Sequence, residues 1–422
     1  MNFIDLNVSH YVRADATGNN DGTDWTNAWT EFPQNKDFIR GHIYYIADGD
    51  YPFYHFSAQQ DGEKYIYIRK ATESDHGTDT GWNSSYGDGQ AKFNDRWEMS
   101  KSYYIFDGKT GGGPGSRETE RGIQVNADDT PFVEGEHMRL VAMHGYPAWN
   151  REMPSNIEFR RIDFRHQGID RIGSHRIINN HADVADPVND GYRNISIRYC
   201  SLYNASTMLI SSVYGSGWVA EYNYFARNNS TPEIHGAAWQ DHGSNNMVVR
   251  YNIFEDTQGT SVIDLKRNLG HSNDNWHIYG NVFFSTNGSD IELGMGIVSD
   301  NGSASGTETT SRIYVYNNTI YNLDGHRSGV EFWVPDDGTR YAYNNLFIRN
   351  RCKVYFNEVN YDYNYYYDNI TLQFDLAEHD QVSDSDPCTD FLNYDFRLSG
   401  ATDAGITLPE LYNKDMYGNI RG

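Results

Sequence analysis

Three short segments of the sequence place an acidic residue between two apolar ones, a pattern that could support acid–base chemistry. They read SVIDLKRN, SDIELGMG and SGVEFWVP, and their acidic residues are Asp264, Glu292 and Glu331. If each segment is a β-strand, the flanking Ile, Leu, Val and Phe point into a core, because successive side chains point to opposite faces. The three carboxylates would then share the outer face of one sheet.

Two further segments extend this row when the apolar positions are aligned. PEIHGAAW and CKVYFNEV add His235 and Tyr355 to the acidic column. Neighbouring strands lie about 4.8 Å apart, so the carboxylates would stack as like charges, which destabilises a sheet. A costly arrangement of this kind marks a candidate site. The predicted catalytic residues are Asp264, Glu292, Glu331, Lys266 and His235.

The same carboxylates support two chemistries. A general acid beside an ionised base or nucleophile would hydrolyse a glycosidic bond. A calcium site that neutralises a uronic carboxylate would instead support β-elimination. Hydrolysis is the favoured hypothesis, with Asp264 and Glu292 as the pair and Glu331 assisting. Calcium is required only by the alternative, and no residue is predicted as a metal ligand.

Aromatic and polar residues near this row are candidates for binding sugar. Flat sugar faces pack on aromatic rings, and polar groups would orient the chain. The predicted substrate-binding residues are Trp239, Trp333, Arg267, His242, Asp241 and Tyr355. Gln240, His181 and Asp183 are weaker candidates for the edge of the same groove. The competing interpretation is a solvated acidic surface with the tryptophans packed under loops.

The elements that would position these residues are repeated strands. From about residue 156 the chain repeats an alternating apolar phrase that ends in Asn-x-aromatic or Asn-x-aliphatic. Alignment of the copies gives a column of Cys200, Asn223, Asn252, Asn281, Asn318 and Asn345. Repeats about 30 residues long with period-two alternation predict a β-solenoid. A turn Asn tolerates unusual backbone angles and can bond its equivalent one coil along. The predicted fold is an all-β, right-handed parallel β-helix.

Both ends of the chain resemble known sequences. YVRADATGNNDGTDWTNAW and GHIYYIADGDYP near the start, and DFRLSGATDAGITLPELYNKDMYGNIRG at the end, are similar to proteins of the pectate-lyase-like superfamily. The resemblance implies a capped β-helix over residues 1–370 and a C-terminal extension over 371–422 that packs on it. This superfamily includes lyases, hydrolases, epimerases and non-catalytic tail proteins, so the resemblance leaves the reaction open.

The central coils also resemble the lyases related to chondroitinase B and the alginate lyases. Glu233 matches the first Glu of that family's pattern, and Lys266 matches its Arg. His235 stands where the second Glu would be, and Gln240 falls near the position of the Lys base. These departures remove the base and half of the metal pair, so the family's mechanism does not carry over whole.

Composition narrows the partners. The chain has 34 Lys+Arg against 58 Asp+Glu, a net charge of −24, which argues against nucleic acid and anionic membranes. No apolar stretch has the length of a membrane span. The three cysteines show no metal-site spacing and are expected to be buried thiols. The expected partner is a polysaccharide, bound by a monomer or homotrimer that is extracellular, secreted or phage-associated. A non-catalytic glycan-binding or phage tail protein remains the alternative from a different class.

Overall fold

The computed structural model describes most of the chain. The described residues are 8–117, 120–127, 138–144, 153–166, 175–181, 191–228, 236–266, 273–286, 297–300, 312–323, 327–332, 339–351, 353–369, 371–390, 393–400, 402–403, 405–409 and 412–420. Within these residues the regular structure is strands and two short 3-10 helices, η1 (Asn35–Asp37) and η2 (Ser84–Tyr86).

Three long parallel sheets run along the molecule. Sheet A has twelve strands, in spatial order β1 (Ser9–Val12), β2 (Ile43–Ile46), β5 (Ile66–Lys70), β8 (Tyr104–Asp107), β11 (Ile157–Arg160), β14 (Ile195–Arg198), β17 (Val219–Glu221), β20 (Asn245–Arg250), β23 (Asp274–Tyr279), β26 (Ile313–Tyr316), β29 (Arg340–Tyr343) and β32 (Asn360–Asp362). Sheet B also has twelve: β3 (Gly49–Tyr51), β6 (Ala91–Phe93), β9 (Ile123–Asn126), β12 (Ile162–Arg165), β15 (Ser201–Ala205), β18 (Tyr224–Asn228), β21 (Ile253–Thr257), β24 (Val282–Phe284), β27 (Thr319–Tyr321), β30 (Leu346–Ile348), β33 (Tyr365–Tyr367) and β35 (Gln381–Ser383).

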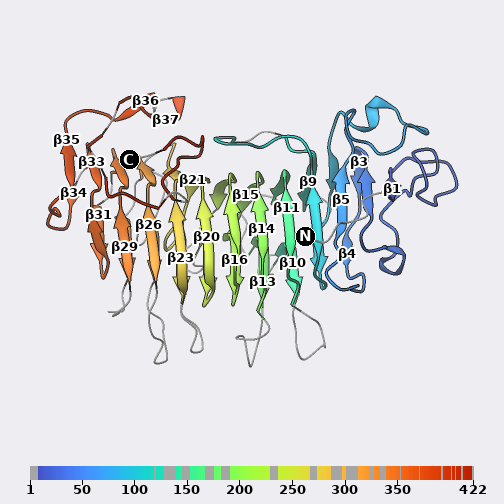
Figure 1. Ribbon diagram of the computed structural model, residues 1–422, viewed down its shortest axis with the longest axis horizontal. Coiled ribbons are helices and arrows are strands. Elements are labelled where there is room, and N and C mark those ends of the chain that lie inside the picture. The colour runs from blue at the N-terminus through green and yellow to red at the C-terminus, as the bar shows by residue number, and fades with distance from the viewer. Residues whose placement is uncertain are drawn as a thin grey trace.

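Sheet C has eleven strands and carries the candidate site. They are β4 (Tyr54–Phe56), β7 (Trp97–Met99), β10 (Met138–His144), β13 (His175–His181), β16 (Met208–Val213), β19 (Ala237–His242), β22 (Ile263–Lys266), β25 (Val298–Asp300), β28 (Arg327–Phe332), β31 (Lys353–Asn357) and β34 (Thr371–Leu372). Every neighbouring pair within sheets A, B and C is parallel, and through most of the chain each coil contributes one strand to each sheet in turn (Figure 1). The predicted right-handed parallel β-helix is confirmed.

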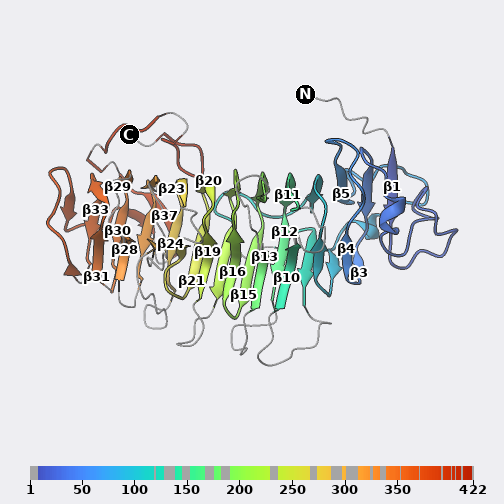
Figure 2. The ribbon, with the colours of Figure 1, turned by 90° about the horizontal axis from the view of Figure 1, so that it is seen from below.

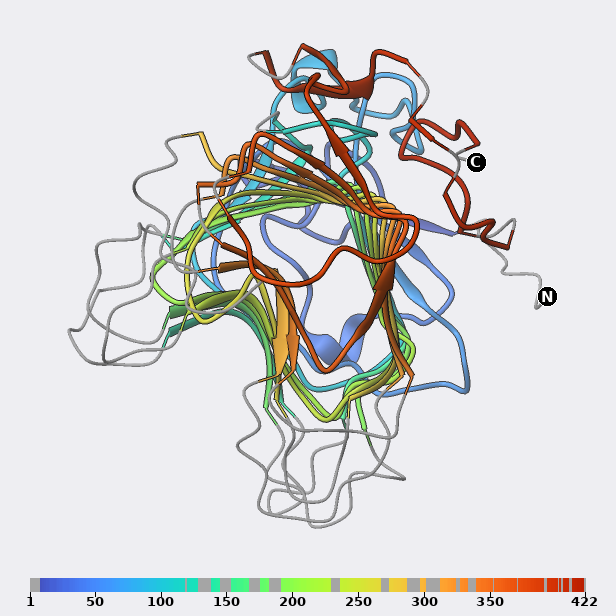
Figure 3. The same cartoon turned by 90° about the vertical axis from the view of Figure 1, so that its left-hand side faces the viewer.

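Seen end-on, the coils superpose around one interior, which is filled by apolar side chains (Figure 3). In sheet C one inward column follows the strand register. It comprises Ile178, Ile210, Trp239, Ile263, Val298, Val330 and Phe356. All seven side chains belong to the buried core. The period-two alternation therefore places the residues next to this column on the outer face of sheet C.

The predicted asparagine column is a continuous buried ladder between sheets A and B. The Asn252 carboxamide oxygen accepts from both the backbone N–H and the Nδ2 of Asn223, at 3.0 Å each. The same pair of bonds repeats through Asn281, Asn318 and Asn345, and continues to Asn364. The left-handed backbone falls on the residue before each ladder position, such as Tyr222 (φ 57°) and Tyr251 (φ 57°), and not on the Asn itself.

The C-terminal residues begin as a further coil and then leave the solenoid. β34 and β35 extend sheets C and B, and the antiparallel pair β36 (Cys388–Asp390) and β37 (Asp395–Leu398) follows. Phe396 and Met416 then pack against apolar side chains of sheet B, and this segment lies outside the coils in Figure 3. The parallel stacking thus runs past residue 370. The proposed division at that residue stays a prediction.

The structure also bears on the predictions for the cysteines and for membrane-spanning segments. Cys200 and Cys388 are buried, as predicted, while Cys352 lies outside the described residues. In the described part of the chain, no helix has the length and apolar character needed to cross a membrane.

Candidate functional site

A row of polar side chains follows the outer face of sheet C from coil to coil. The strand register places these residues opposite one another in sequence, and we call them the polar row: Asn179, Ser211, Gln240, Asp264, Ser299, Glu331 and Asn357. Figure 2 shows several of the strands that carry them side by side. All except Asn357 are buried, with Asp264 at 0% and Glu331 at 2% exposure. Burial of so many polar groups is costly unless they are paired or bind a ligand.

The register corrects the acidic column that the sequence suggested. Asp264 lies opposite Gln240 on one side and Ser299 on the other, whereas the prediction placed His235 and Glu292 there. His235 and Glu292, together with Glu233, Asp183, Arg267 and Trp333, lie outside the described residues. No stack of adjacent carboxylates therefore forms on the described strands. Glu331, which was expected to be solvated, is buried and lies opposite Asn357 instead of Tyr355.

The error has a physical cause. Period-two alternation fixes which face a residue takes within a strand, but it does not fix which segment of the next coil forms the paired strand. The residue beside Asp264 is therefore five positions from the predicted one on one side (Gln240) and seven on the other (Ser299). The chain offers two apolar stretches before β28, IEL at 291–293 and IV at 297–298, and the second one forms β25. In β19 the large Trp239 takes the inward position opposite Ile263, so the strand lies further along the chain than predicted.

Asp264 and three neighbouring side chains form a connected polar group. The Nζ of Lys266 lies 3.2 Å from Asp264 Oδ2, and Gln240 Nε2 donates to the same oxygen at 3.1 Å. A ring nitrogen of His242, Nε2, lies 3.3 Å from Gln240 Oε1. Lys266 is 9% exposed, so the ion pair is largely withdrawn from water. The lysine compensates the carboxylate charge, which burial would otherwise make strongly unfavourable.

Two predicted sugar-binding residues instead face the interior of the coil. Trp239 is fully buried, and its indole N–H donates to Ser212 Oγ at 2.7 Å. Asp241 is also fully buried; it accepts from the Ser244 hydroxyl at 2.6 Å and from the hydroxyl of Ser212. Burial raises the pKa of Asp241 to about 7, while the serine hydrogen bonds lower it. Neither side chain lies on the outer face with the polar row, and a role of either one in sugar binding stays a prediction.

The remaining predicted residues lie nearer the expected place. His242 and Lys266 are opposite each other on β19 and β22, next to the polar row. Tyr355 is half-buried on β31, opposite Gly329 and two residues before Asn357. The backbone of His181 ends β13, opposite His144. The structure thus brings together Asp264, Lys266, His242 and Gln240, with Glu331 two strands away.

Sequence reasoning missed the N-terminal part of the row. Asn179 and Ser211 lie on the strands HRIINNH and MLISSV, which precede the segments that were aligned. Their signal was present, because each strand interrupts an apolar run with polar residues. Ser299 was missed since its strand, Val298–Asp300, has only three residues. In the described ranges, no group of three or more His, Cys, Asp or Glu side chains is arranged to hold a metal ion.

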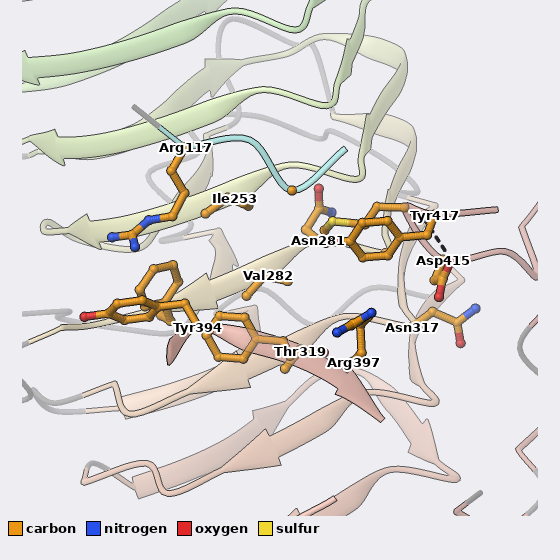
Figure 4. Close-up of a pocket in the computed structure, with 15 residues that line it drawn as sticks. Arg117, Ile253, Asn281, Val282, Asn317, Thr319, Tyr394, Arg397, Asp415 and Tyr417 are labelled. Atoms are coloured by element: carbon orange, nitrogen blue, oxygen red, sulfur yellow. Dashed lines mark hydrogen bonds between the residues drawn. The ribbon is translucent and has the colours of Figure 1, made fainter. Parts of the chain in front are cut away.

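A separate cavity of about 60 Å³ lies between sheet B and the C-terminal segment (Figure 4). Arg117 stands on one side of it, 4.2 Å from the centre of the Tyr394 ring, and its Nε donates to Glu255 at 2.7 Å. Tyr417 and Asp415 close the other side. None of its lining residues belongs to the polar row. These contacts fasten the C-terminal segment to the solenoid.

The chain is similar to known proteins in its fold only. No family model and no curated protein sequence matches the chain. Among solved structures, the chain is similar to the GH136 lacto-N-biosidase from Eubacterium ramulus (12% identity, 89% of this chain and 67% of that chain, TM-score 0.40). It is also similar to pectate lyase Pel9A (12%, 99% and 88%, TM-score 0.40) and to PfbA, a surface adhesin of Streptococcus pneumoniae (10%, 81% and 83%, TM-score 0.32).

The three names cover a glycosidase, a lyase and an adhesin. The structure has a parallel β-helix fold, which its own strand pairing shows. At these identities the similarity leaves the activity open, so a functional hypothesis has to be argued from the polar row.

Proposed function

We propose that the chain is a polysaccharide-degrading enzyme whose active site is the polar row of sheet C, and that it acts as a glycoside hydrolase. The observation that carries this proposal is the ion pair of Asp264 with Lys266 on the outer face of a sheet, with Asp264 fully buried. The attraction between two buried charges seldom exceeds the free energy needed to remove them from water, and the packing of the interior does not require this pair. A functional role explains why it is kept.

Asp264 and Glu331 are the proposed carboxylate pair, replacing the pair Asp264 and Glu292 suggested by the sequence. Their strands, β22 and β28, are separated by β25, so the backbones are two strand spacings, about 10 Å, apart. Inverting glycosidases hold their carboxyl groups about 6.5–9.5 Å apart, and retaining ones about 5–5.5 Å. The spacing therefore favours inversion, with room for a water molecule beside Ser299.

The surroundings suggest a role for each group. Asp264, whose charge Lys266 compensates, would act as the base that takes a proton from the attacking water. Glu331 would protonate the leaving oxygen. Gln240 fixes the Asp264 carboxylate through its 3.1 Å hydrogen bond, and His242 in turn contacts Gln240. This second contact orients the amide so that its N–H₂, and not its oxygen, faces the carboxylate.

Asp264→Asn and Glu331→Gln test the proposal on a panel of neutral and acidic polysaccharides, with new reducing ends as the readout. Each variant should lose at least about 100-fold in turnover, the usual contribution of a general acid or base. Asp274→Asn is a matched control, because Asp274 pairs with Arg312 on sheet A. Normal turnover by both site variants would contradict the assignment. Sugar binding without any cleavage by the wild type would favour the non-catalytic alternative.

A polysaccharide lyase is the second candidate, and one observation favours it. His242 and Lys266 are opposite each other beside the row, and either could act as the base that removes a proton next to a uronic carboxylate. Elimination gives an unsaturated product, whereas hydrolysis does not. Ultraviolet absorbance of that double bond, with and without a chelator, therefore separates a lyase, and its calcium dependence, from the hydrolase.

A further inference from the structure

Two arginines lie side by side at the N-terminal end of the polar row. Arg139 of β10 and Arg176 of β13 are opposite each other in the strand register. Several other strand arginines have carboxylate partners, as for Arg160 with Glu158, Arg198 with Glu221 and Arg250 with Glu221. Within the described ranges Arg139 has no such partner. A chain with a net charge of −24 has therefore placed two like positive charges together.

The geometry holds one of these guanidinium groups against the polar row. Arg176 Nη1 donates to Asn179 Oδ1 at 2.9 Å and to Ser211 Oγ at 3.3 Å. Burial, with a smaller contribution from the charge of Arg139, lowers the pKa of Arg176 to about 10. An arginine that is restrained, partly desolvated and repelled by its neighbour is stabilised by a bound anion.

Asn179, which contacts Arg176, carries a further donor. Asn179 is 1% exposed, and its Nδ2 has no hydrogen-bond partner among the residues that the structure describes. A buried amide N–H₂ without a partner costs about 1–3 kcal/mol. Its oxygen is held by Arg176, so the side chain that carries the unpartnered N–H₂ is in contact with one of the two arginines. Two guanidinium groups and an amide form a set of donors suited to a planar or tetrahedral oxyanion.

We propose that Arg139, Arg176 and Asn179 form a subsite for an anionic substituent of the glycan, either a carboxylate or a sulfate ester. This inference rests on the proposed function of the polar row and specifies its substrate class. Arg176 and Asp264 are three strands apart, about 14 Å across the sheet, and three residues along it. A chain lying along the solenoid axis would thus contact both. The anion-binding group is several sugars away from the bond that is cleaved.

Binding measured apart from cleavage tests this subsite. Full-length Asp264→Asn protein is titrated with polygalacturonate, with its carboxyl-reduced neutral form, with chondroitin sulfate and with desulfated, carboxyl-reduced chondroitin. We expect at least tenfold tighter binding of one acidic probe than of its neutral counterpart. Arg139→Gln and Arg176→Gln, each added to this background, should abolish the difference, whereas Arg312→Gln on sheet A should not. Because chondroitin sulfate carries both groups, desulfated chondroitin and carboxyl-reduced chondroitin sulfate are added to distinguish a carboxylate from a sulfate site.

The outcomes separate this subsite from the enzymatic proposal. Equal binding of acidic and neutral probes, no binding of either acidic probe, or unchanged preference in both arginine variants would overturn it. A preference for the acidic probes in a protein that cleaves no polysaccharide would support the anion subsite and contradict the proposed enzymatic function. Cleavage of only a neutral glycan, lost in Asp264→Asn, would support the enzymatic function and contradict the anion subsite. If Arg176→Gln fails to fold, Arg139→Gln still decides, because Arg139 makes no hydrogen bond to another described residue.

Discussion

Two rows of polar side chains run along the solenoid, and they differ in how they repeat. The ladder between sheets A and B uses Asn at each position from Asn223 to Asn364, and each Asn makes the same bonds. The polar row on sheet C changes residue type from coil to coil. A row that satisfies the backbone at every turn needs the same side chain each time. A row that binds a ligand of varied chemistry needs different ones, which is the pattern that the proposed glycan site requires.

Replacement of a ladder residue should give the largest loss of stability. In Asn252→Ala, the backbone N–H of Asn223 loses its acceptor and the carbonyl of Ala220 loses its donor, both inside the protein. Each unsatisfied buried group costs about 1–3 kcal/mol, and the Asn223 amide loses a bond as well. We expect a decrease of about 4 kcal/mol in the free energy of unfolding, measured in urea. The exposed Asn19 provides the control, since Asn19→Ala should change stability by less than about 0.5 kcal/mol.

Asp264→Asn should destabilise the protein less than Asn252→Ala does. A second substitution at its partner Lys266 should show that the lost ion pair is the cause. The variant leaves Lys266 without a counter-charge, and removal of one member of a buried pair costs about 3–5 kcal/mol. Lys266 retains some contact with water, so we expect the lower end, about 3 kcal/mol. Adding Lys266→Met should restore most of the stability measured in urea, without restoring turnover. An Asp264→Asn variant as stable as the wild type would show that the ion pair contributes little to stability.

Asp241 should give the smallest effect, visible as a dependence on pH. Its pKa is raised in the folded protein to about 7, above the usual value of about 3.9. The folded state therefore holds the proton more tightly, and this stability is lost as pH rises toward 7 and beyond. Between pH 5.5 and pH 8 the loss amounts to about 2 kcal/mol.

The Asp241→Asn variant removes this titration. Its free energy of unfolding should decline less than that of the wild type over the same pH interval, with turnover at pH 6 retained because the side chain faces the interior. Urea unfolding at several pH values provides the measurement. A variant with the same pH dependence as the wild type would place the titrating group elsewhere, and a variant inactive at pH 6 would return Asp241 to the site.

Much of the fold follows from local patterns. Alternating apolar residues, the repeat of about 30 residues and the recurrent Asn each constrain a strand or a turn within one coil, and all three agree. The inward positions of Ile263, Leu265 and Val330 were therefore predictable. The outward placement of Asp264 and Glu331 followed from the same alternation. Local pattern could not show that these outward residues are buried.

Which residues become neighbours across the coils depends on the tertiary structure. The sequence determines the face of each side chain through the two-residue period of a strand, but the pairing between coils depends on loop lengths and on how the interior packs. Trp239 occupies the core position opposite Ile263, and in this register Gln240 lies beside Asp264. The same shift turns Asp241 inward and brings Ser299 between Asp264 and Glu331. Residues about 30 positions apart in the sequence become neighbours because of how side chains of different volume pack in the interior. The sequence of one repeat does not specify this packing.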